Sequence, residues 1–250
     1  MNIRNPVSFL LALAIIGLTA LVARGQSVAE WKPAGLSNYG DSPFGPTLID
    51  PHLTSGGLVR GPGVTTASGA PNDTWGGTGF TQTSLAGAID AGTYYTLSLQ
   101  PATGYTASLS GLQARVRIPE GDIANYSYQW QFSLNGGGYV DIGTPLGFGT
   151  YNGNGTIQPL IDLSGVAGLQ SFSGGVTLRM VVWYTGDGAP ANNTSIVIGR
   201  GTTASVAGLF VNGAVTAVPE GNTEALFFLG LAGCAVCGAL RARRGSLGGR

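Results

Sequence analysis

The middle of the chain alternates hydrophobic and polar residues with a period of two and lacks a long segment of helical period. Such alternation is typical of β-strands that bury one face. The clearest stretch is residues 126–134, where Tyr, Tyr, Trp, Phe and Leu share one face and Ser, Gln, Gln and Ser share the other. The glycine-rich run that begins at Asn135-Gly136 predicts a hairpin whose loop can exceed two residues.

Other short runs of β-branched and aromatic residues predict further strands between Gly, Asn, Asp and Pro residues. These strands are expected at residues 28–31, 58–59, 93–99, 139–142, 157–163, 176–184, 195–198 and 206–215. Residues 105–118 are expected to hold two strands, broken near Ser110-Gly111. A short helix is expected at residues 84–89 and a further turn of helix at residues 163–169. With 43 glycines for turns, the pattern predicts an all-β fold, a β-sandwich or a barrel.

The N-terminal residues 1–25 have the pattern of a signal peptide. Arg4 precedes an uncharged, mostly apolar stretch over residues 7–23, and Ala23-Arg24-Gly25 places small residues where a signal peptidase reads them. Cleavage before Gln26 is therefore expected. The alternative is a membrane anchor that is never cut, but the stretch is short for a span.

The C-terminal residues 218–250 have three parts. Val218-Pro219-Glu220-Gly221 precede an uncharged apolar helix expected over residues 225–240. The basic tail 241–250 follows, with a cluster formed by Arg241, Arg243 and Arg244. Sixteen helical residues span about 24 Å, against roughly 30 Å of hydrocarbon, and the arginines should stay cytoplasmic.

This tail, over about residues 217–244, resembles the PEP-CTERM sorting signal of bacteria that carry an exosortase. Gly221 stands where that motif usually has proline. The resemblance implies processing by an exosortase-type membrane protease or transpeptidase, transient retention in the inner membrane, and final location at the cell surface or outside the cell. It also implies association with exopolysaccharide or a biofilm matrix. An ordinary single-span anchor is the alternative.

The body, residues 26–217, fits one domain and resembles a recurring type of PEP-CTERM passenger domain. The matching features, in order, are Trp31, the stretches 58–63, 72–76, 103–105, 133–137 and 161–164, and Thr177-Leu178-Arg179. The resemblance implies a two-sheet, jelly-roll-like β-sandwich, and it carries little chemistry.

Charge and cysteine content exclude several classes of function. The body holds six basic and ten acidic residues with no basic stripe, which argues against nucleic-acid binding. Both cysteines, Cys234 and Cys237, lie in the apolar tail segment, so the body has no disulfide. A Cys-x-x-Cys pair suggests redox or metal chemistry, but a metal site needs two more ligands, and packing of a helix explains the pair better.

The sequence offers no catalytic constellation, so we expect a protein that is not an enzyme. His52 is the only histidine, and it stands in a loop-like Asp-Pro-His sequence. The acids are scattered, and Asp141 and Asp162 are the pair that the fold could bring together for glycan hydrolysis. No cofactor is expected beyond a structural calcium ion, for which the loop residues Asp187, Asn192 and Asn193 are weak candidates that Asx turns explain equally well.

Carbohydrate binding would need exposed aromatic rings beside amide or carboxylate groups. Trp75 and Tyr151 are the candidate ligand-binding residues, and Trp183 and Tyr184 are weaker ones; Tyr151 stands in a glycine-rich loop. Trp31, Trp130 and Trp183 lie in predicted strands and are expected in the core. The leading expectation is thus a non-catalytic surface or matrix protein; a carbohydrate-binding module and a secreted hydrolase are the alternatives.

Overall fold

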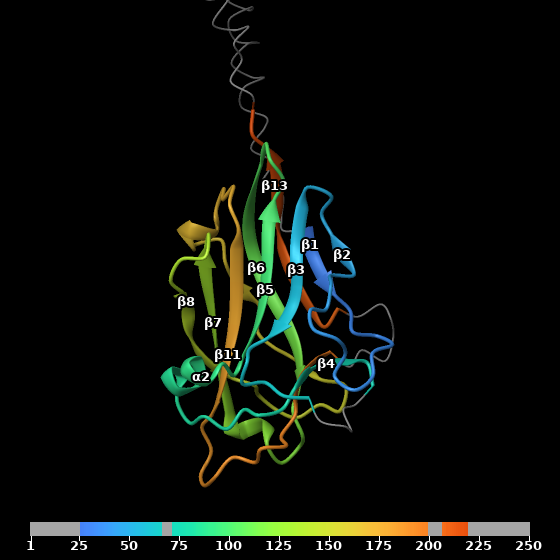
Figure 1. Cartoon of the computed structure of the whole chain (residues 1–250), viewed down its shortest axis with the longest axis vertical. Coiled ribbons are helices and arrows are strands. Elements are labelled where there is room, and N and C mark those ends of the chain that lie inside the picture. The colour runs from blue at the N-terminus through green and yellow to red at the C-terminus, as the bar shows by residue number, and fades with distance from the viewer. Residues whose placement is uncertain (1–25, 67–71, 200–206, 220–250) are drawn as a thin grey trace, which may run out of the picture. The chain divides into compact units, whose positions relative to one another are not determined.

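The computed structural model describes residues 26–66, 72–199 and 207–219, and it has two antiparallel sheets with little helix. An eight-stranded sheet, here sheet I, contains β1 (Gln26–Trp31), β2 (Leu48–Ile49), β4 (Thr74–Gly77), β6 (Tyr105–Arg117), β9 (Thr156–Ile157), β10 (Ile161–Asp162), β12 (Ile196–Gly199) and β13 (Leu209–Ala217). A five-stranded sheet, here sheet II, contains β3 (Leu53–Arg60), β5 (Tyr94–Pro101), β7 (Tyr126–Leu134), β8 (Val140–Gly147) and β11 (Val176–Tyr184). The predicted all-β sandwich is confirmed (Figure 1).

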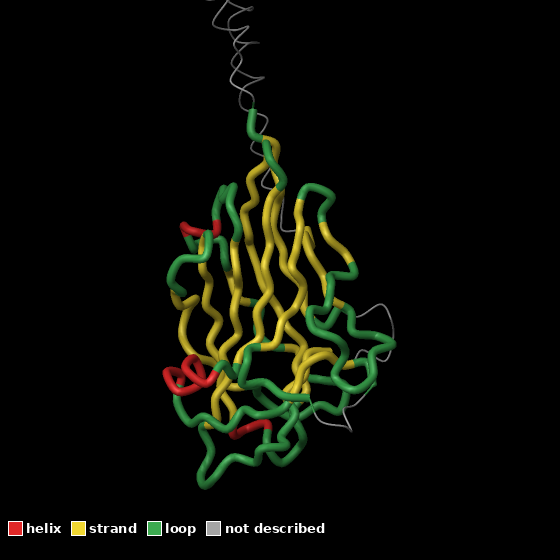
Figure 2. The backbone as a smooth tube through the Cα atoms, viewed as in Figure 1, coloured by secondary structure: helices red, strands yellow, loops and turns green. Residues whose placement is uncertain are grey.

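The two sheets bury a single large core between them. In sheet I the strand order is β2-β1-β13-β6-β12-β4, with β9 and β10 also paired to β6; in sheet II it is β3-β5-β11-β7-β8. Trp31 and Trp130 lie in the core, as the sequence predicted. Figure 2 shows how strands make up most of the sandwich, with loops gathered at its ends.

The central pair of sheet II follows directly from the alternation in its two strands. β7 and β11 pair without a bulge from Val176 opposite Leu134 to Tyr184 opposite Tyr126. Both strands have the bounds that the sequence predicted. In both strands every second residue points into the core, and the residues between them form the outer face of sheet II, where Val181 and Trp183 are apolar.

The expected break within residues 105–118 is wrong, because β6 is one continuous strand of 13 residues. The buried face changes phase at Gly111 and Leu112: Ala107 and Leu109 are buried before this point, and Ala114 is buried after it. At Gly111 the strand also takes up pairing with β10. A phase slip of one residue within a strand leaves the same mark in a sequence as a turn between two strands.

Helices occupy little of the described chain. Helix α2 (Leu85–Ala91) is capped by Ser84, whose hydroxyl accepts a hydrogen bond from the Gly87 N–H, and it ends at Gly92 with φ of 74°. Ala88 of this helix packs on Val181 and Trp183 of the outer face of sheet II. Two 3₁₀ turns, η1 (Ile123–Asn125) and η2 (Ala167–Leu169), complete the set, and the short helix expected near 84–89 and the turn of helix expected near 163–169 are both present.

The terminal segments fall largely outside the described residues. The expected signal peptide 1–25 and the expected sorting tail from Glu220 onward, with its apolar stretch 225–240 and arginines, lie outside the described residues. Within the described residues, no helix has the length and hydropathy needed to cross a bilayer. The chain divides after Thr216 into two compact units, and Val218 and Pro219 of the second unit are exposed.

Candidate functional site

The outer face of sheet II carries two rows of polar side chains. The strand register places Thr177 beside Ser98 on β5 and Ser133 on β7. The next row, two residues along β11, places Arg179 between Thr96 and Gln131. Because residues two apart share a face, the two rows lie roughly 7 Å apart on the same surface.

Arg179 is the charged centre of this face. Its side chain is only 7% exposed. Its Nε and Nη2 both donate to Oε1 of Gln131, at 2.9 and 2.5 Å. The guanidinium carbon lies 3.6 Å from the ring centroid of Tyr139 and 4.9 Å from that of Tyr94. The two aromatic faces attract the cation and fix the plane of the guanidinium group.

The hydrogen bonds around this cation continue to the neighbouring strand. Nε2 of Gln131 donates to Oδ1 of Asp141 at 2.6 Å, and Asp141 lies opposite Gln131 in the register of β7 and β8. Burial raises the pKa of the Tyr139 hydroxyl, while the charge of Arg179 lowers it in part. The network ties the β7–β8 hairpin to the face of the sheet.

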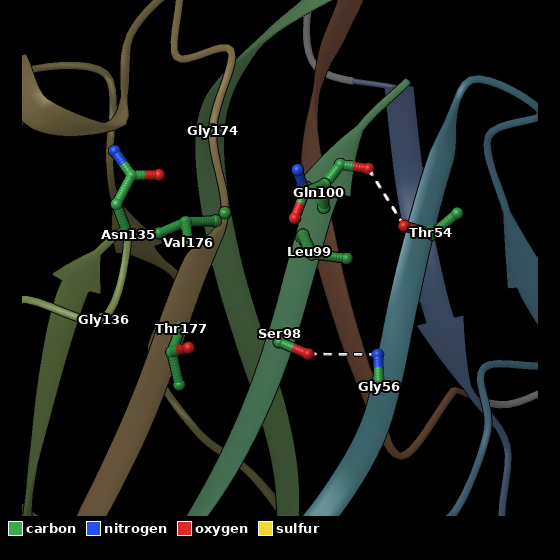
Figure 3. A pocket seen from close by; sticks show the side chains of 11 residues that line it. Thr54, Gly56, Ser98, Leu99, Gln100, Asn135, Gly136, Gly174, Val176 and Thr177 are labelled. Carbon is green, nitrogen blue, oxygen red and sulfur yellow. Dashed lines mark hydrogen bonds between the residues drawn. The ribbon is translucent and has the colours of Figure 1, made fainter. Parts of the chain in front are cut away.

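A groove of about 470 Å³ is lined in part by Thr177 and Ser98, whose row is next to that of Arg179 in the strand register; Arg179 itself is not a lining residue. Hydroxyl and amide side chains and glycines line most of it, and none of its lining residues is charged. Figure 3 shows Thr177 and Ser98 on adjacent strands, with Asn135 on one side and Thr54 on the other.

Glycines create the space in the groove. A Cβ on Gly174 would meet Oδ1 of Asn135 at 1.9 Å, and one on Gly175 would come within 3.3 Å of Oε1 of Gln100. The Ser98 hydroxyl accepts a hydrogen bond from the Gly56 N–H at 3.0 Å. Hydroxyls, amides and free backbone are the groups that hydrogen-bond a polyhydroxylated ligand.

Trp75 does not belong to this site, and the expectation of an exposed ring there is wrong. The residue is fully buried, and its indole Nε1 donates to the carbonyl of Asp41 at 2.7 Å. The guanidinium of Arg60 lies over its ring at 4.9 Å. A ring enclosed in this way has no face left for a ligand. The sequence stretches 58–63 and 72–76 are therefore parts of one packing arrangement.

The other aromatic candidates lie elsewhere. Tyr151 is half-buried against the core, in the loop that follows β8, and is not among the groove-lining residues. Trp183 is buried beneath α2, as its place in a strand predicted. Tyr184 is buried too, and its hydroxyl donates to the Asp187 carbonyl at 3.0 Å.

The side chains considered for metal or acid chemistry are dispersed. Asp187, Asn192 and Asn193 are exposed loop residues, and the described residues contain no group of three or more His, Cys, Asp or Glu side chains placed to hold a metal ion. Asp141 lies on sheet II and Asp162 on sheet I. Hydrogen bonds from Ser164 lower the pKa of Asp162. His52 stacks on Tyr105 with ring centroids 3.9 Å apart.

Sequence reasoning did not select Arg179 or Gln131 as site residues. The polar positions of the two strands are the sequence signal that points to them. Gln129 and Gln131 stand on the polar face of one strand, and Thr177 and Arg179 interrupt an apolar run in another. Comparison of the chain with family models, with curated proteins and with solved structures gave no match to any of them.

Proposed function

We propose that this chain is an exported, non-catalytic protein of the cell surface or extracellular matrix, sorted through its PEP-CTERM-like tail. The observation that carries the proposal is the pairing of a signal-peptide pattern at one end with the motif of Val218 to Gly221, the apolar stretch and the arginines at the other. In this proposal signal peptidase cuts before Gln26, the apolar tail holds the protein at the inner membrane, and an exosortase-type enzyme then cuts near the motif.

Mass spectrometry of the mature protein, made in its own host, tests the sorting proposal. The expected C-terminus lies near residues 218–221. A matched variant with Arg241, Arg243 and Arg244 changed to Gln should lose retention in the membrane and escape processing, because the positive charges hold the tail on the cytoplasmic side. Recovery of an intact Arg250 from membranes of cells with the unaltered chain would reject processing and leave a simple anchor.

The strand order supports a finer classification of the body as a jelly roll. In sheet II the hairpin β7–β8 lies beside β11, which in turn lies beside β5; in sheet I the last strand, β13, lies between β1 and β6. Strands far apart in the sequence are thus neighbours in both sheets, as Greek-key connections require. Jelly rolls occur in lectin domains among others, but a fold alone does not determine a function.

The second candidate function is carbohydrate binding, and the groove on sheet II favours it. Its lining of Ser98, Thr177, Gln100 and Asn135 offers donors and acceptors for sugar hydroxyls, and the adjacent Tyr139 is 37% exposed. A rigid sheet is also a better support for such groups than a loop. The groove replaces Trp75 as the candidate carbohydrate-binding site. That Tyr151 contacts a carbohydrate stays a prediction.

Affinity electrophoresis in gels that contain neutral or acidic polysaccharides tests this second candidate. Thr177→Phe should fill the groove and abolish any retardation, because the new ring occupies the space of the ligand. Thr106→Phe on β6 of sheet I is the matched control and should bind like the unaltered chain. Equal retardation of the two variants would place binding elsewhere, and no retardation in any gel would reject the carbohydrate-binding role.

A further inference from the structure

The strongest unexplained feature of the molecule is the Arg179 cation, which has no counter-ion in the described part of the chain. The described residues contain one ion pair, between Lys32 and Glu30, and it lies elsewhere. Burying a charge without an opposite charge is unfavourable, and the two tyrosine faces and one amide oxygen compensate only in part. Arg179 therefore carries a positive charge that an anionic partner could neutralise.

The donors of Arg179 are distributed unevenly. Nε and Nη2 share one acceptor, Oε1 of Gln131. The structure gives Nη1 no hydrogen bond, and Nη1 is not among the buried atoms that lack a partner. Nη1 therefore keeps some contact with solvent, although the side chain as a whole is only 7% exposed.

The surrounding residues hold the guanidinium group in one orientation. Because Nε2 of Gln131 donates to Asp141, its Oε1 must face Arg179. Tyr139 packs against the guanidinium plane from 3.6 Å. A cation fixed in advance loses little side-chain entropy when an anion binds.

We propose that Arg179 binds the carboxylate of a uronic acid residue in an acidic polysaccharide that lies along the groove. This inference rests on the proposed carbohydrate-binding role. Nη1 donates to a carboxylate oxygen, and the hydroxyls of Ser98 and Thr177, one row away, bond to hydroxyls of the adjoining sugar. Asp141 lies one strand beyond Gln131, so its charge weakens but does not cancel the attraction for an anion.

The test uses the purified full chain and two probes with the same sugar backbone: polygalacturonate, which is charged, and its methyl ester, in which a methyl group removes each charge. Isothermal titration calorimetry should show polygalacturonate binding at least tenfold more tightly than the ester, with affinity falling as salt rises. Arg179→Gln should remove roughly tenfold or more of the affinity for the acid and leave that for the ester unchanged. Arg179→Lys should fall between, because lysine cannot form the fork on Gln131.

The Asp141→Asn variant distinguishes binding of an anion at Arg179 from a purely structural role of the Gln131–Asp141 pair. Asparagine keeps an acceptor for Gln131 and removes one negative charge, so binding of polygalacturonate should tighten roughly two- to fivefold. A residue pair that only pins the hairpin would give no such gain. Thermal unfolding of each variant shows whether lost binding reflects lost folding.

The outcomes distinguish this inference from the function on which it rests. Equal binding of acid and ester, or a folded Arg179→Gln variant that still prefers the acid, would overturn the carboxylate site and leave carbohydrate binding standing. Binding to dextran sulfate alone would also overturn it, because the anion recognised would then be a sulfate. Absence of binding to every polysaccharide would reject both.

Discussion

Arg60 and Arg179 are both largely removed from solvent, but their hydrogen-bond acceptors differ. Arg60 donates through Nε to the Gly76 carbonyl at 2.5 Å and through Nη2 to the carbonyls of Tyr39 and Gly40. Burial lowers its pKa, and Asp41 and Tyr95 nearby raise it in part. All its acceptors are backbone carbonyls of the protein itself. Arg179, in contrast, donates to one side-chain amide oxygen through Nε and Nη2, and its Nη1 has no hydrogen bond in the described part of the chain.

Arg60→Met should therefore destabilise the fold strongly. Methionine fills much of the same space but removes the side-chain donor from three backbone carbonyls in a partly buried place, of which that of Tyr39 keeps a bond from the Gly76 N–H. The loss should lower the free energy of unfolding by about 2–4 kcal/mol. Urea unfolding measures this change. Lys32→Met is the control: its ion pair is partly exposed, so its loss should stay within about 0.5 kcal/mol. Equal effects of the two substitutions would contradict the role given to Arg60.

At the scale of elements, the β7–β8 hairpin is where sequence and structure agree most closely. Asn135 and Gly136 have φ of 50° and 73°, and the Gly137 N–H donates to the Leu134 carbonyl at 2.8 Å. This is a type I′ turn, which the Asn-Gly pair predicts. The Ser133 hydroxyl then donates to the Gly137 carbonyl at 2.6 Å, so the loop extends past two residues.

Gly136→Ala and Gly138→Ala make a matched pair within this loop. Neither new Cβ would meet an atom within 4 Å, but only Gly136 has a positive φ. Gly136→Ala should therefore lower the free energy of unfolding by about 1–2 kcal/mol, purely through backbone strain. Gly138→Ala should be neutral or slightly stabilising. Thermal and urea unfolding measure the two free energies. Equal losses for both variants would contradict the role given to the positive φ of Gly136.

An element can be predicted from the sequence when residues within that element determine it, and not when distant strands do. β7 was predictable because its nine residues alternate, and β11 because its nine residues form an apolar run with few interruptions. β6 was not, because its phase slip depends on which strands pair with Gly111. Trp75 looked available as a ligand platform because nothing local shows that Arg60 will cover its ring.

The candidate site was harder to predict than the fold for the same reason. Each of its rows contains residues from at least three strands that are far apart in the sequence. Arg179 and Gln131 are 48 residues apart, and only the register of β11 with β7 brings them together. The sequence could suggest that polar positions face outward, but not which of them become neighbours.

At the scale of the whole sandwich, hydrophobic packing and hydrogen bonds dominate over ionic contacts. Large aromatic side chains, among them Tyr95, Tyr128 and Phe148, are almost completely buried between the sheets. Tyr128 packs on Phe148 with ring centroids 4.6 Å apart, and its hydroxyl has no hydrogen-bond partner in the described part of the molecule. Burial raises the pKa of Tyr128 to about 12 and raises that of Tyr95 further.

These raised pKa values predict that stability falls at alkaline pH. Below pH 10 the tyrosines are protonated in both states, so their contribution is fully present. Between pH 10 and about 12 the unfolded chain releases protons that folded Tyr128 still holds, so the free energy of unfolding decreases as pH rises. Urea unfolding at pH 8, 10, 11 and 12 should show this decrease.

Tyr128→Phe should reduce the alkaline loss and add about 1 kcal/mol of stability at pH 8, because it removes a buried hydroxyl that has no partner. Tyr105→Phe is the control, since Tyr105 stacks on His52 and its hydroxyl is not among the buried unpartnered atoms. A Tyr128→Phe protein that is less stable at pH 8 would mean that the hydroxyl is bonded to an internal water. An unchanged pH profile would mean that other tyrosines, with Tyr95 first among them, cause the alkaline loss.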